Sequence, residues 1–204
     1  MKSSWLLGLL VVLLLSITLP VSADVVSTSG LTVVTPPSGA NITSDFVITY
    51  GLPAQIIFNE RQSVTLASPL VTDTGTIAAG TVVDSQFFAV NSDAEAVVDT
   101  SATFDGKVLG IIYLDSSSNY TPSDFLGLST LLYNESCGNC GFESGDTASF
   151  SGNTASFHTD YSVPGDFARV ITLASPSTTP EPSSLVLIGA GLLGVVKRVR
   201  RLAR

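Results

Sequence analysis

The sequence predicts a mainly β protein built as an antiparallel β-sandwich, for which a jelly roll is one of the strand arrangements left open. Short runs rich in Val, Ile, Thr and Phe recur along the chain, and Gly, Pro, Ser and Asn separate them. These runs do not alternate with long amphipathic helices, as the strands of a parallel α/β sheet would. A signal helix at the N-terminus and a transmembrane helix at the C-terminus complete the prediction.

The strands of the first half follow from these runs. Four short strands are expected at Leu31–Thr35, Asp45–Tyr50, Ala54–Asn59 and Gln62–Ala67, and three longer ones at Thr81–Val90, Ala94–Thr103 and Lys107–Leu114. Asn91-Ser92-Asp93 and Asp105-Gly106 break the longer runs, and Asp-Gly is the stronger hairpin signal of the two. The unbroken apolar run Val108–Leu114 indicates a strand that is covered on both faces.

A repeat of Thr-Ala-Ser-Phe marks the clearest hairpin, Thr147–His158. A two-residue Gly152-Asn153 loop would pair Phe150 with Ala155 and Ala148 with Phe157, so that these four side chains share one apolar face. The opposite, polar face would carry Ser149, Ser151, Thr154, Ser156 and His158. A last strand is expected at Phe167–Ala174, and Pro122–Tyr133 is predicted to be helical or irregular.

The first 23 residues read as a signal peptide. Lys2 supplies the positive charge, an apolar run begins at Trp5, and small residues lead to a cleavage site between Ala23 and Asp24. The alternative is an anchor helix that is not cleaved. The apolar run is short and a cleavage site follows it, which favours the signal peptide.

The C-terminal end has three parts. A Ser/Thr/Pro linker at 175–179 and Pro180-Glu181-Pro182 precede an apolar run at 183–196. As a helix this run would reach roughly 21 Å, which spans the cytoplasmic membrane only with local thinning or snorkelling side chains. The basic residues that follow would hold this end in the cytoplasm and leave the preceding domain outside. They are Lys197, Arg198, Arg200, Arg201 and Arg204.

These three parts, in this order and behind a signal peptide, resemble the PEP-CTERM sorting signal of bacterial envelope and secreted proteins. The resemblance covers about 25 residues, 180–204. It implies an exosortase-like membrane protease as a partner, removal of the tail, and delivery to the cell surface or an extracellular matrix. Glu181 and its flanking prolines would then mark the processing region, where the prolines keep the chain extended. A plain single-span anchor is the alternative.

The segment between the two ends carries a much stronger charge than the whole chain. Residues 24–182 hold all 17 acidic residues but only three basic ones, a net charge of −14 compared with −8 for the 204-residue chain. They also hold all 15 Phe and Tyr residues, enough to build the core of an acidic domain at 24–174. A nucleic-acid partner is excluded, because binding phosphates requires clustered Lys and Arg.

Few residues of this domain have the pattern of a chemical site. Cys137 and Cys140 are predicted to form a small structural disulfide, because an exported protein meets oxidising conditions. His158 is expected to face solvent on its strand, and no G-x-S-x-G motif accompanies it. Asp93, Glu95, Asp99 and Asp105 lie close in sequence without the spacing of a specific site. No metal or other cofactor is predicted, and calcium on loop carboxylates is the one alternative left open.

The predicted function is that of a non-enzymatic envelope or matrix protein with a structural or adhesive domain. One alternative is a carbohydrate-binding module that contacts exopolysaccharide, which exposed, coplanar rings among Tyr113, Tyr120, Tyr133 and Tyr161 would favour. The other alternative is a secreted hydrolase. A concave pocket that brings His158 within hydrogen-bond reach of an Asp and a Ser would favour it.

Overall fold

The computed structural model describes residues 24–43, 46–91, 96–113, 121–133, 142–161 and 165–175. They all fall within one of the two units of the chain, Ser22–Ser175. The predicted signal peptide, the predicted linker beyond Ser175 and the C-terminal tail lie outside the described residues. In the part of the chain that is described, no helix has the length and apolar character needed to cross a membrane.

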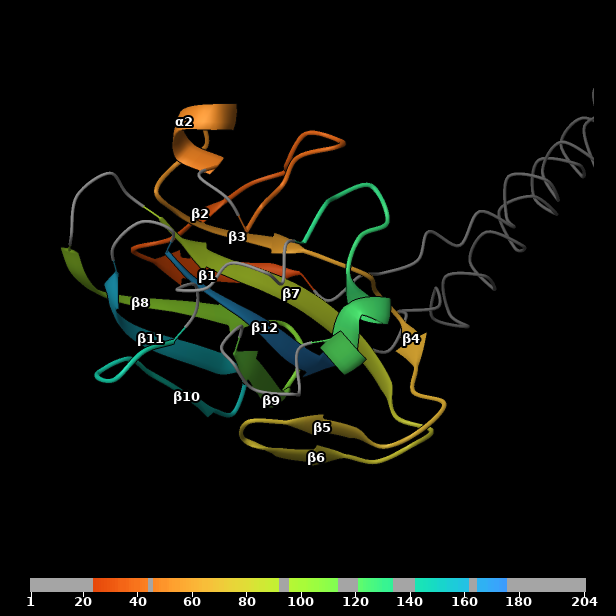
Figure 1. Cartoon of the computed structure of the whole chain (residues 1–204). Helices are drawn as coiled ribbons and strands as arrows, with labels where there is room; N and C mark the ends of the chain where they lie inside the picture. Colours follow the sequence, from red (N-terminus) through yellow and green to blue (C-terminus); the bar gives the residue numbers. More distant parts are fainter. Residues whose placement is uncertain are drawn as a thin grey trace, which may run out of the picture. The chain divides into compact units, whose positions relative to one another are not determined.

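Strands dominate this unit, as predicted, and Figure 1 shows their arrangement. The strands are β1 (Val25–Ser29), β2 (Thr32–Val33), β3 (Gln55–Asn59), β4 (Val64–Thr65), β5 (Leu70–Thr72), β6 (Gly75–Ile77), β7 (Val82–Val90), β8 (Ala96–Phe104), β9 (Val108–Tyr113), β10 (Thr147–Ser151), β11 (Thr154–Tyr161) and β12 (Asp166–Leu173). The helical elements are α2 (Phe46–Tyr50) and a 3-10 helix, η1 (Thr121–Leu126).

Two antiparallel-rich sheets form the body of the unit. The smaller has the order β1-β8-β11-β10, and the larger has the order β2-β3-β7-β12-β9 with β4 also paired to β7. Strands β2 and β3 are parallel, whereas the other pairings within these two sheets are antiparallel. A separate hairpin of β5 and β6 lies beside β9.

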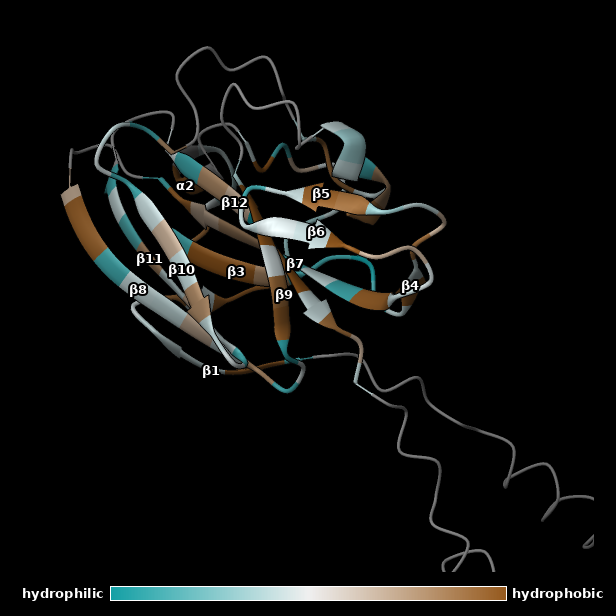
Figure 2. Cartoon of the chain, turned by 90° about the horizontal axis from the view of Figure 1, so that it is seen from below, coloured by the Kyte–Doolittle hydropathy of each residue, from teal (hydrophilic) through white to brown (hydrophobic). Residues whose placement is uncertain are grey.

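The two sheets pack face to face over a shared apolar core. Phe88 of β7 stacks on Phe157 of β11, with ring centroids 3.9 Å apart and planes at 8°. Ala102 and Phe104 of the smaller sheet join Val170 and Ile111 of the larger one in the same cluster. The alternating hydropathy of β8, β10 and β11 in Figure 2 fits this arrangement, because only one face of the smaller sheet is buried.

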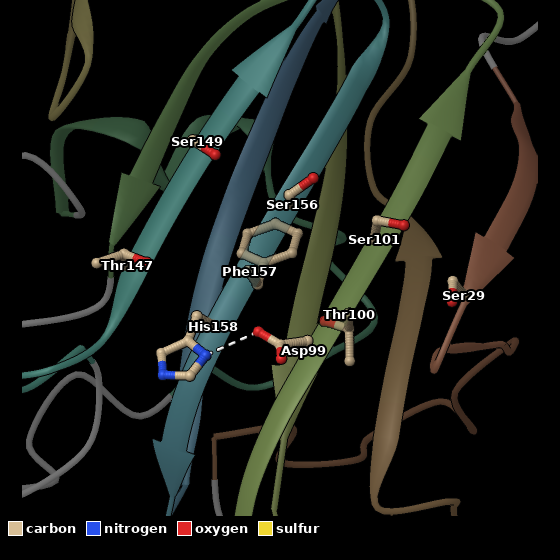
Figure 3. Close-up of a pocket in the computed structure, with 9 residues that line it drawn as sticks. All are labelled: Ser29, Asp99, Thr100, Ser101, Thr147, Ser149, Ser156, Phe157 and His158. Carbon is tan, nitrogen blue, oxygen red and sulfur yellow. Dashed lines mark hydrogen bonds and ion pairs between the residues drawn. The ribbon is translucent and has the colours of Figure 1, made fainter.

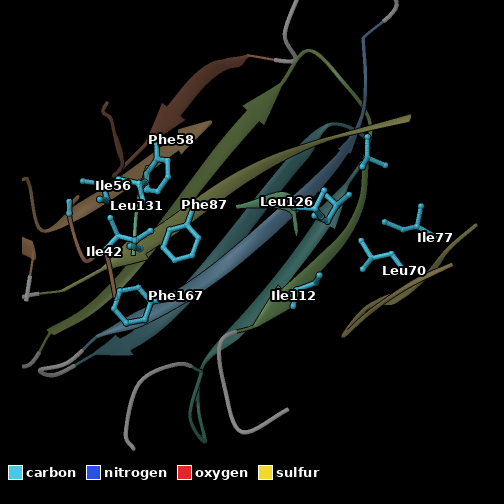
Figure 4. Close-up of a cluster of buried hydrophobic side chains, with 14 of the residues drawn as sticks. Ile42, Ile56, Phe58, Leu70, Ile77, Phe87, Ile112, Leu126, Leu131 and Phe167 are labelled. Atoms are coloured by element: carbon cyan, nitrogen blue, oxygen red, sulfur yellow. The ribbon is translucent and has the colours of Figure 1, made fainter. Parts of the chain in front are cut away.

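A second core covers the other face of the larger sheet. Phe58, Phe87 and Phe167 point from this face toward Ile42 and Leu131 of the covering segments (Figure 4). The larger sheet is therefore buried on both sides, and β12 is buried at seven of its eight positions. The prediction of a doubly covered strand at 108–114 is confirmed for β9, although β12 is more completely buried.

The predicted hairpin at 147–158 is confirmed with its register. Phe150 pairs with Ala155 and Ala148 pairs with Phe157. Gly152 takes a positive φ of 61°, as the first central position of such a turn requires. The expected strands at 54–59, 81–90, 94–103, 107–114 and 167–174 correspond to β3, β7, β8, β9 and β12, and the irregular segment at 122–133 contains η1.

The strand predicted at Asp45–Tyr50 is wrong, because the described part of this segment forms the short helix α2. Val47 and Tyr50, three positions apart, both pack on the second core, which a helix allows and a strand does not. Gly51 ends the helix with a positive φ of 64°, and its N–H donates to the Val47 carbonyl at 2.9 Å. Gly51 was the sequence signal for this helix end.

The hairpin suggested by Asp105-Gly106 is also wrong, because β8 and β9 belong to different sheets. The chain crosses between the layers here, and Gly106 passes so close to Leu173 that a Cβ would lie 2.2 Å from the Leu173 carbonyl oxygen. The expected strands at 31–35 and 62–67 shorten to β2 and β4, and β1, β5 and β6 were not predicted.

Candidate functional site

The smaller sheet carries small hydroxyl side chains on its outward face. We call this surface the hydroxyl face; its Ser and Thr residues are Ser27, Ser29, Ser101, Thr103, Thr147, Ser149, Ser151, Thr154 and Ser156. These side chains are exposed or half-buried, because they alternate with the inward residues of the core. The sequence predicted the β10 and β11 part of this face but not its continuation over β8 and β1.

Strand register aligns these residues in rows across the sheet. Ser29 pairs with Ser101, Ser101 with Ser156, and Ser156 with Ser149, so one serine from each of four strands forms a single row. Figure 3 shows the four side chains in sequence across the strands. A second row is Ser27, Thr103, Thr154 and Ser151, in which the Thr103 and Thr154 hydroxyls are 3.0 Å apart.

His158 and Asp99 lie beside the serine row. The His158 Nδ1 atom is 2.7 Å from Asp99 Oδ1, and the two side chains are 45% and 87% exposed. Both contribute to an open hollow of about 340 Å³ that also includes Ser29, Ser101 and Ser156. A His–Asp pair in a hollow is half of the arrangement that would favour a hydrolase.

The other half of that arrangement is not formed among the described residues. In Figure 3 the second ring nitrogen of His158 points away from Asp99 and from the labelled serines. In a catalytic triad this nitrogen faces the nucleophilic hydroxyl while the aspartate holds Nδ1. In the described part of the chain, His158 therefore makes an exposed contact with Asp99 and has no serine partner.

A buried ion pair lies on the opposite side of the molecule, under η1. Arg169 of β12 donates from Nε and Nη2 to the two carboxylate oxygens of Glu60, at 2.6 and 3.0 Å, and both side chains are completely buried. Ser85 donates to the same carboxylate at 2.6 Å, and Arg169 also donates to Ser123 of η1. This network joins the larger sheet to its cover and satisfies the buried charges, so we assign it a structural role.

Asp166 is a second buried acid, in less favourable surroundings. It is 3% exposed, and its Oδ2 atom has no hydrogen-bond partner among the described residues. Burial, reinforced by the nearby charges of Asp146, Glu143 and Asp160, raises the pKa of Asp166 to about 8. The Asp146 carboxylate accepts hydrogen bonds from the backbone N–H groups of Glu143 and Asp160, at 2.6 and 2.7 Å.

The acidic residues do not assemble a metal centre in the described part of the chain. No group of three or more His, Cys, Asp or Glu side chains there could hold a metal ion. Of the acidic residues weighed from the sequence, Asp93 and Glu95 lie outside the described residues, and Asp99 pairs with His158. Calcium binding therefore stays an untested alternative.

Of the four tyrosines weighed from the sequence, the two whose side chains are described are not part of an exposed aromatic platform. Tyr113 stacks on Phe142, with centroids 4.7 Å apart, and its hydroxyl donates to the Ala148 carbonyl at 3.2 Å. Tyr133 packs edge-on against Phe87 in the second core, and burial raises the pKa of its phenol. Tyr120 lies outside the described residues, and the side chain of Tyr161 is not described.

Several predicted sites fall outside the described residues. They are Cys137, Cys140, Ala23, Pro180, Glu181, Pro182 and the five basic residues of the tail. Asp24 is described. Its carboxylate accepts a hydrogen bond from Asn59 at 2.9 Å and its carbonyl accepts one from Asp105 at 3.2 Å. The expected first residue of the exported protein is thus hydrogen-bonded to β3 of the larger sheet and to Asp105, the residue that follows β8.

Comparison with known proteins identifies only the C-terminal tail. No curated protein and no solved structure matches the chain. Residues 178–201 match the family model of the PEP-CTERM protein-sorting motif. This match contains Pro180-Glu181-Pro182, the apolar run and four of the five basic residues. It indicates an exported protein that is transiently anchored in the membrane and sorted by an exosortase. The chain therefore carries a PEP-CTERM protein-sorting motif at its C-terminal tail.

Proposed function

We propose that the protein is a non-enzymatic component of a bacterial envelope or extracellular matrix, with a structural or adhesive β-domain. In this proposal a signal peptidase removes residues 1–23, and an exosortase-like membrane protease removes the tail after it has held the protein in the membrane. The observation that carries the proposal is the sorting motif at 178–201. The motif indicates how the protein is delivered, but it does not indicate what the β-domain binds.

The geometry of the domain supports a binding role over a hydrolytic one. The hydroxyl face is a large polar surface, and its His158–Asp99 pair has no serine at the second ring nitrogen (Figure 3). The other strong polar network, around Arg169 and Glu60, is fully buried and satisfied by its own partners. Substitution of His158 by Ala should leave surface delivery unchanged.

A carbohydrate-binding module is the second candidate, and the hydroxyl face favours it. Binding through stacked tyrosines has no support from Tyr113 and Tyr133, which are half-buried and pack on Phe142 and Phe87. Recognition would instead depend on hydrogen bonds from serine and threonine hydroxyls, each of which can both donate and accept.

Mass spectrometry of the exported protein tests the targeting part of the proposal. We expect an N-terminus at Asp24 and the absence of the basic residues 197–204. The matched variant replaces Pro180 and Pro182 by Ala, which should leave the domain unchanged but prevent tail removal, so that the protein stays in the membrane fraction. Recovery of wild-type protein that begins at Asp24 and still contains Arg204 would show that the tail is only an anchor.

A structural or adhesive role is tested on intact cells. A strain that lacks the protein should lose matrix cohesion or attachment, and the wild-type gene should restore it. The Pro180/Pro182 variant, expressed at the same level, should restore it poorly because it is not released. An unchanged matrix in the strain that lacks the protein would contradict this role.

A further inference from the structure

The hydroxyl face has a composition that the fold alone does not require. Strands are normally enriched in Thr, Val, Ile and aromatic residues, which fit a pleated surface better than Ser does. Here four neighbouring strands place serine at matching positions, Ser29, Ser101, Ser156 and Ser149. The opposite face of the same four strands lies in an apolar core that also contains the buried Thr100 and Thr159, so among the described residues it is the serines that are confined to the outer surface.

Small side chains leave the polar surface of these strands open. Ser29, Ser149 and Ser156 are exposed, and no described segment covers them. Strands lie about 4.8 Å apart, and residues of one face repeat about every 6.8 Å along a strand, so the hydroxyls form a regular two-dimensional array. A ligand that presents hydroxyls repeatedly along an extended chain can match such an array, whereas a compact small molecule meets only part of it.

The charge of the surroundings selects among such ligands. The hydroxyl face contains no Lys or Arg among the described residues, and its charged members are Asp99 beside His158 and Asp160 at the edge. The wider segment 24–182 carries −14. This negative charge would repel anionic polysaccharides. The face also lacks the basic side chains that such polymers need for binding.

From these observations we infer that the hydroxyl face is a docking surface for an uncharged, extended polysaccharide. The inference rests on the adhesive role proposed above and specifies the partner class. The polymer lies across the strands along the row Ser29–Ser101–Ser156–Ser149, and the exposed His158 ring contacts it from the neighbouring row (Figure 3).

This mode of binding has a characteristic dependence on ligand length. Each hydroxyl contact replaces a hydrogen bond to water, so a single sugar gains little net free energy. A polymer repeats the contact many times, and its second and later contacts are intramolecular. Affinity should therefore rise steeply with chain length and should respond only weakly to salt, because no ion pairs form.

Affinity gel electrophoresis of the exported protein tests the inference. One gel contains a soluble neutral glucan and a parallel gel contains polygalacturonate as an anionic polymer. We expect retardation in the neutral gel only. Glucan oligosaccharides should reverse the retardation, whereas glucose at the same mass concentration should not. Retardation by polygalacturonate alone, no retardation by the glucan, or equal competition by glucose would overturn the proposal.

Matched variants locate the binding surface. Ser29→Glu with Ser156→Glu places two long side chains on the row, and Ser68→Glu with Ser129→Glu adds the same charge at exposed positions elsewhere. The first pair should weaken retardation roughly tenfold or more, since it displaces several contacts at once, while the second should not. Equal retardation of both variants would overturn the proposal. Thermal melting checks that each variant is folded.

Two further readouts separate this inference from its alternatives. A wild-type dimer that Ser29→Glu with Ser156→Glu makes monomeric would identify the face as an interface between copies of the chain and would overturn the proposal. Tail processing is measured by mass spectrometry on the same samples. Correct processing without glucan retardation contradicts only the docking surface, whereas failed processing contradicts the proposed route of delivery.

Discussion

Buried Asp166 illustrates a side chain that works against the stability of its own fold. Its pKa is raised to about 8 by burial and by Asp146, Glu143 and Asp160, compared with 3.8 for an unburied carboxyl. Between these values the native state keeps a proton that the unfolded chain releases. The native state thus binds more protons than the unfolded state, and the free energy of unfolding falls as pH rises through this window.

We therefore predict that Asp166→Asn, which removes the titration, stabilises the protein at alkaline pH. Well below pH 3.8 the two proteins should have similar stability, because Asp166 is then protonated in both the native and the unfolded state. Toward pH 8 the free energy of unfolding of the variant should rise relative to that of the wild type. This difference should increase by at most about 1.4 kcal/mol per pH unit. Urea unfolding at a series of pH values measures the difference, with Asp105→Asn as an exposed control. Parallel pH profiles for wild type and Asp166→Asn would contradict the assignment.

The Arg169–Glu60 ion pair, in contrast to Asp166, contributes to the stability of the fold. Arg169→Met would leave the Glu60 carboxylate buried without its bidentate partner, and removing one member of a buried pair typically costs about 3–5 kcal/mol. Chemical denaturation should show this loss. The matched control is Arg61→Met, because Arg61 is exposed and also donates to the backbone of η1, at 2.7 Å from Phe125 O.

The control for Arg169→Met should change stability by less than about 1 kcal/mol. A double variant that also replaces Glu60 by Leu should recover part of the loss, since no unpaired charge stays buried. Equal losses for Arg169→Met and Arg61→Met would show that the ion pair contributes no more than a surface contact.

At the scale of elements, two glycines make different demands on the chain. Gly152 needs its positive φ of 61° but has open space around it, whereas Gly106 is crowded by the Leu173 carbonyl. Gly152→Ala should cost about 1–2 kcal/mol, the penalty for a left-handed L-residue. Gly106→Ala should cost more, because two backbones must separate.

Urea unfolding of both variants checks this order. Ser149→Ala, an exposed change on β10, is the control and should have an effect within about 0.5 kcal/mol. If Gly152→Ala proved the more damaging variant, the crossover at Gly106 would not be as tight as the structure shows.

The same two glycines explain which elements the sequence could reveal. The hairpin at 147–158 is local, so the repeat and its Gly-Asn turn predict both pairing and faces. The Asp105-Gly106 turn looks similar in sequence, but β9 pairs with β12, which lies far along the chain. Local turn signals do not record which sheet a strand joins. Tertiary packing likewise overrode β propensity at α2, where Val47 and Tyr50 share a helical face.

The site shows the same limit. Both His158 and Asp99 stood out in the sequence, but 59 positions separate them and only the β8–β11 register brings them together. Arg169 and Glu60 are 109 positions apart, and nothing local marks either as buried. The sorting motif was predictable in full, because a protease and a membrane recognise a short continuous segment.

At the scale of the whole molecule, the basic residues of the two terminal segments offset part of the acidic charge of the domain between them. Cleavage at Asp24 alone would leave residues 24–204 with a charge of −9, whereas loss of the basic tail as well would leave 24–182 with −14. The released protein should therefore elute later from an anion exchanger than the membrane-held form. It should also focus at a lower pH. The Pro180/Pro182 variant supplies the membrane-held reference. Co-elution of the two forms would mean that the basic tail survives export, and then the acidic domain would stay fixed to the membrane and could not join an extracellular matrix.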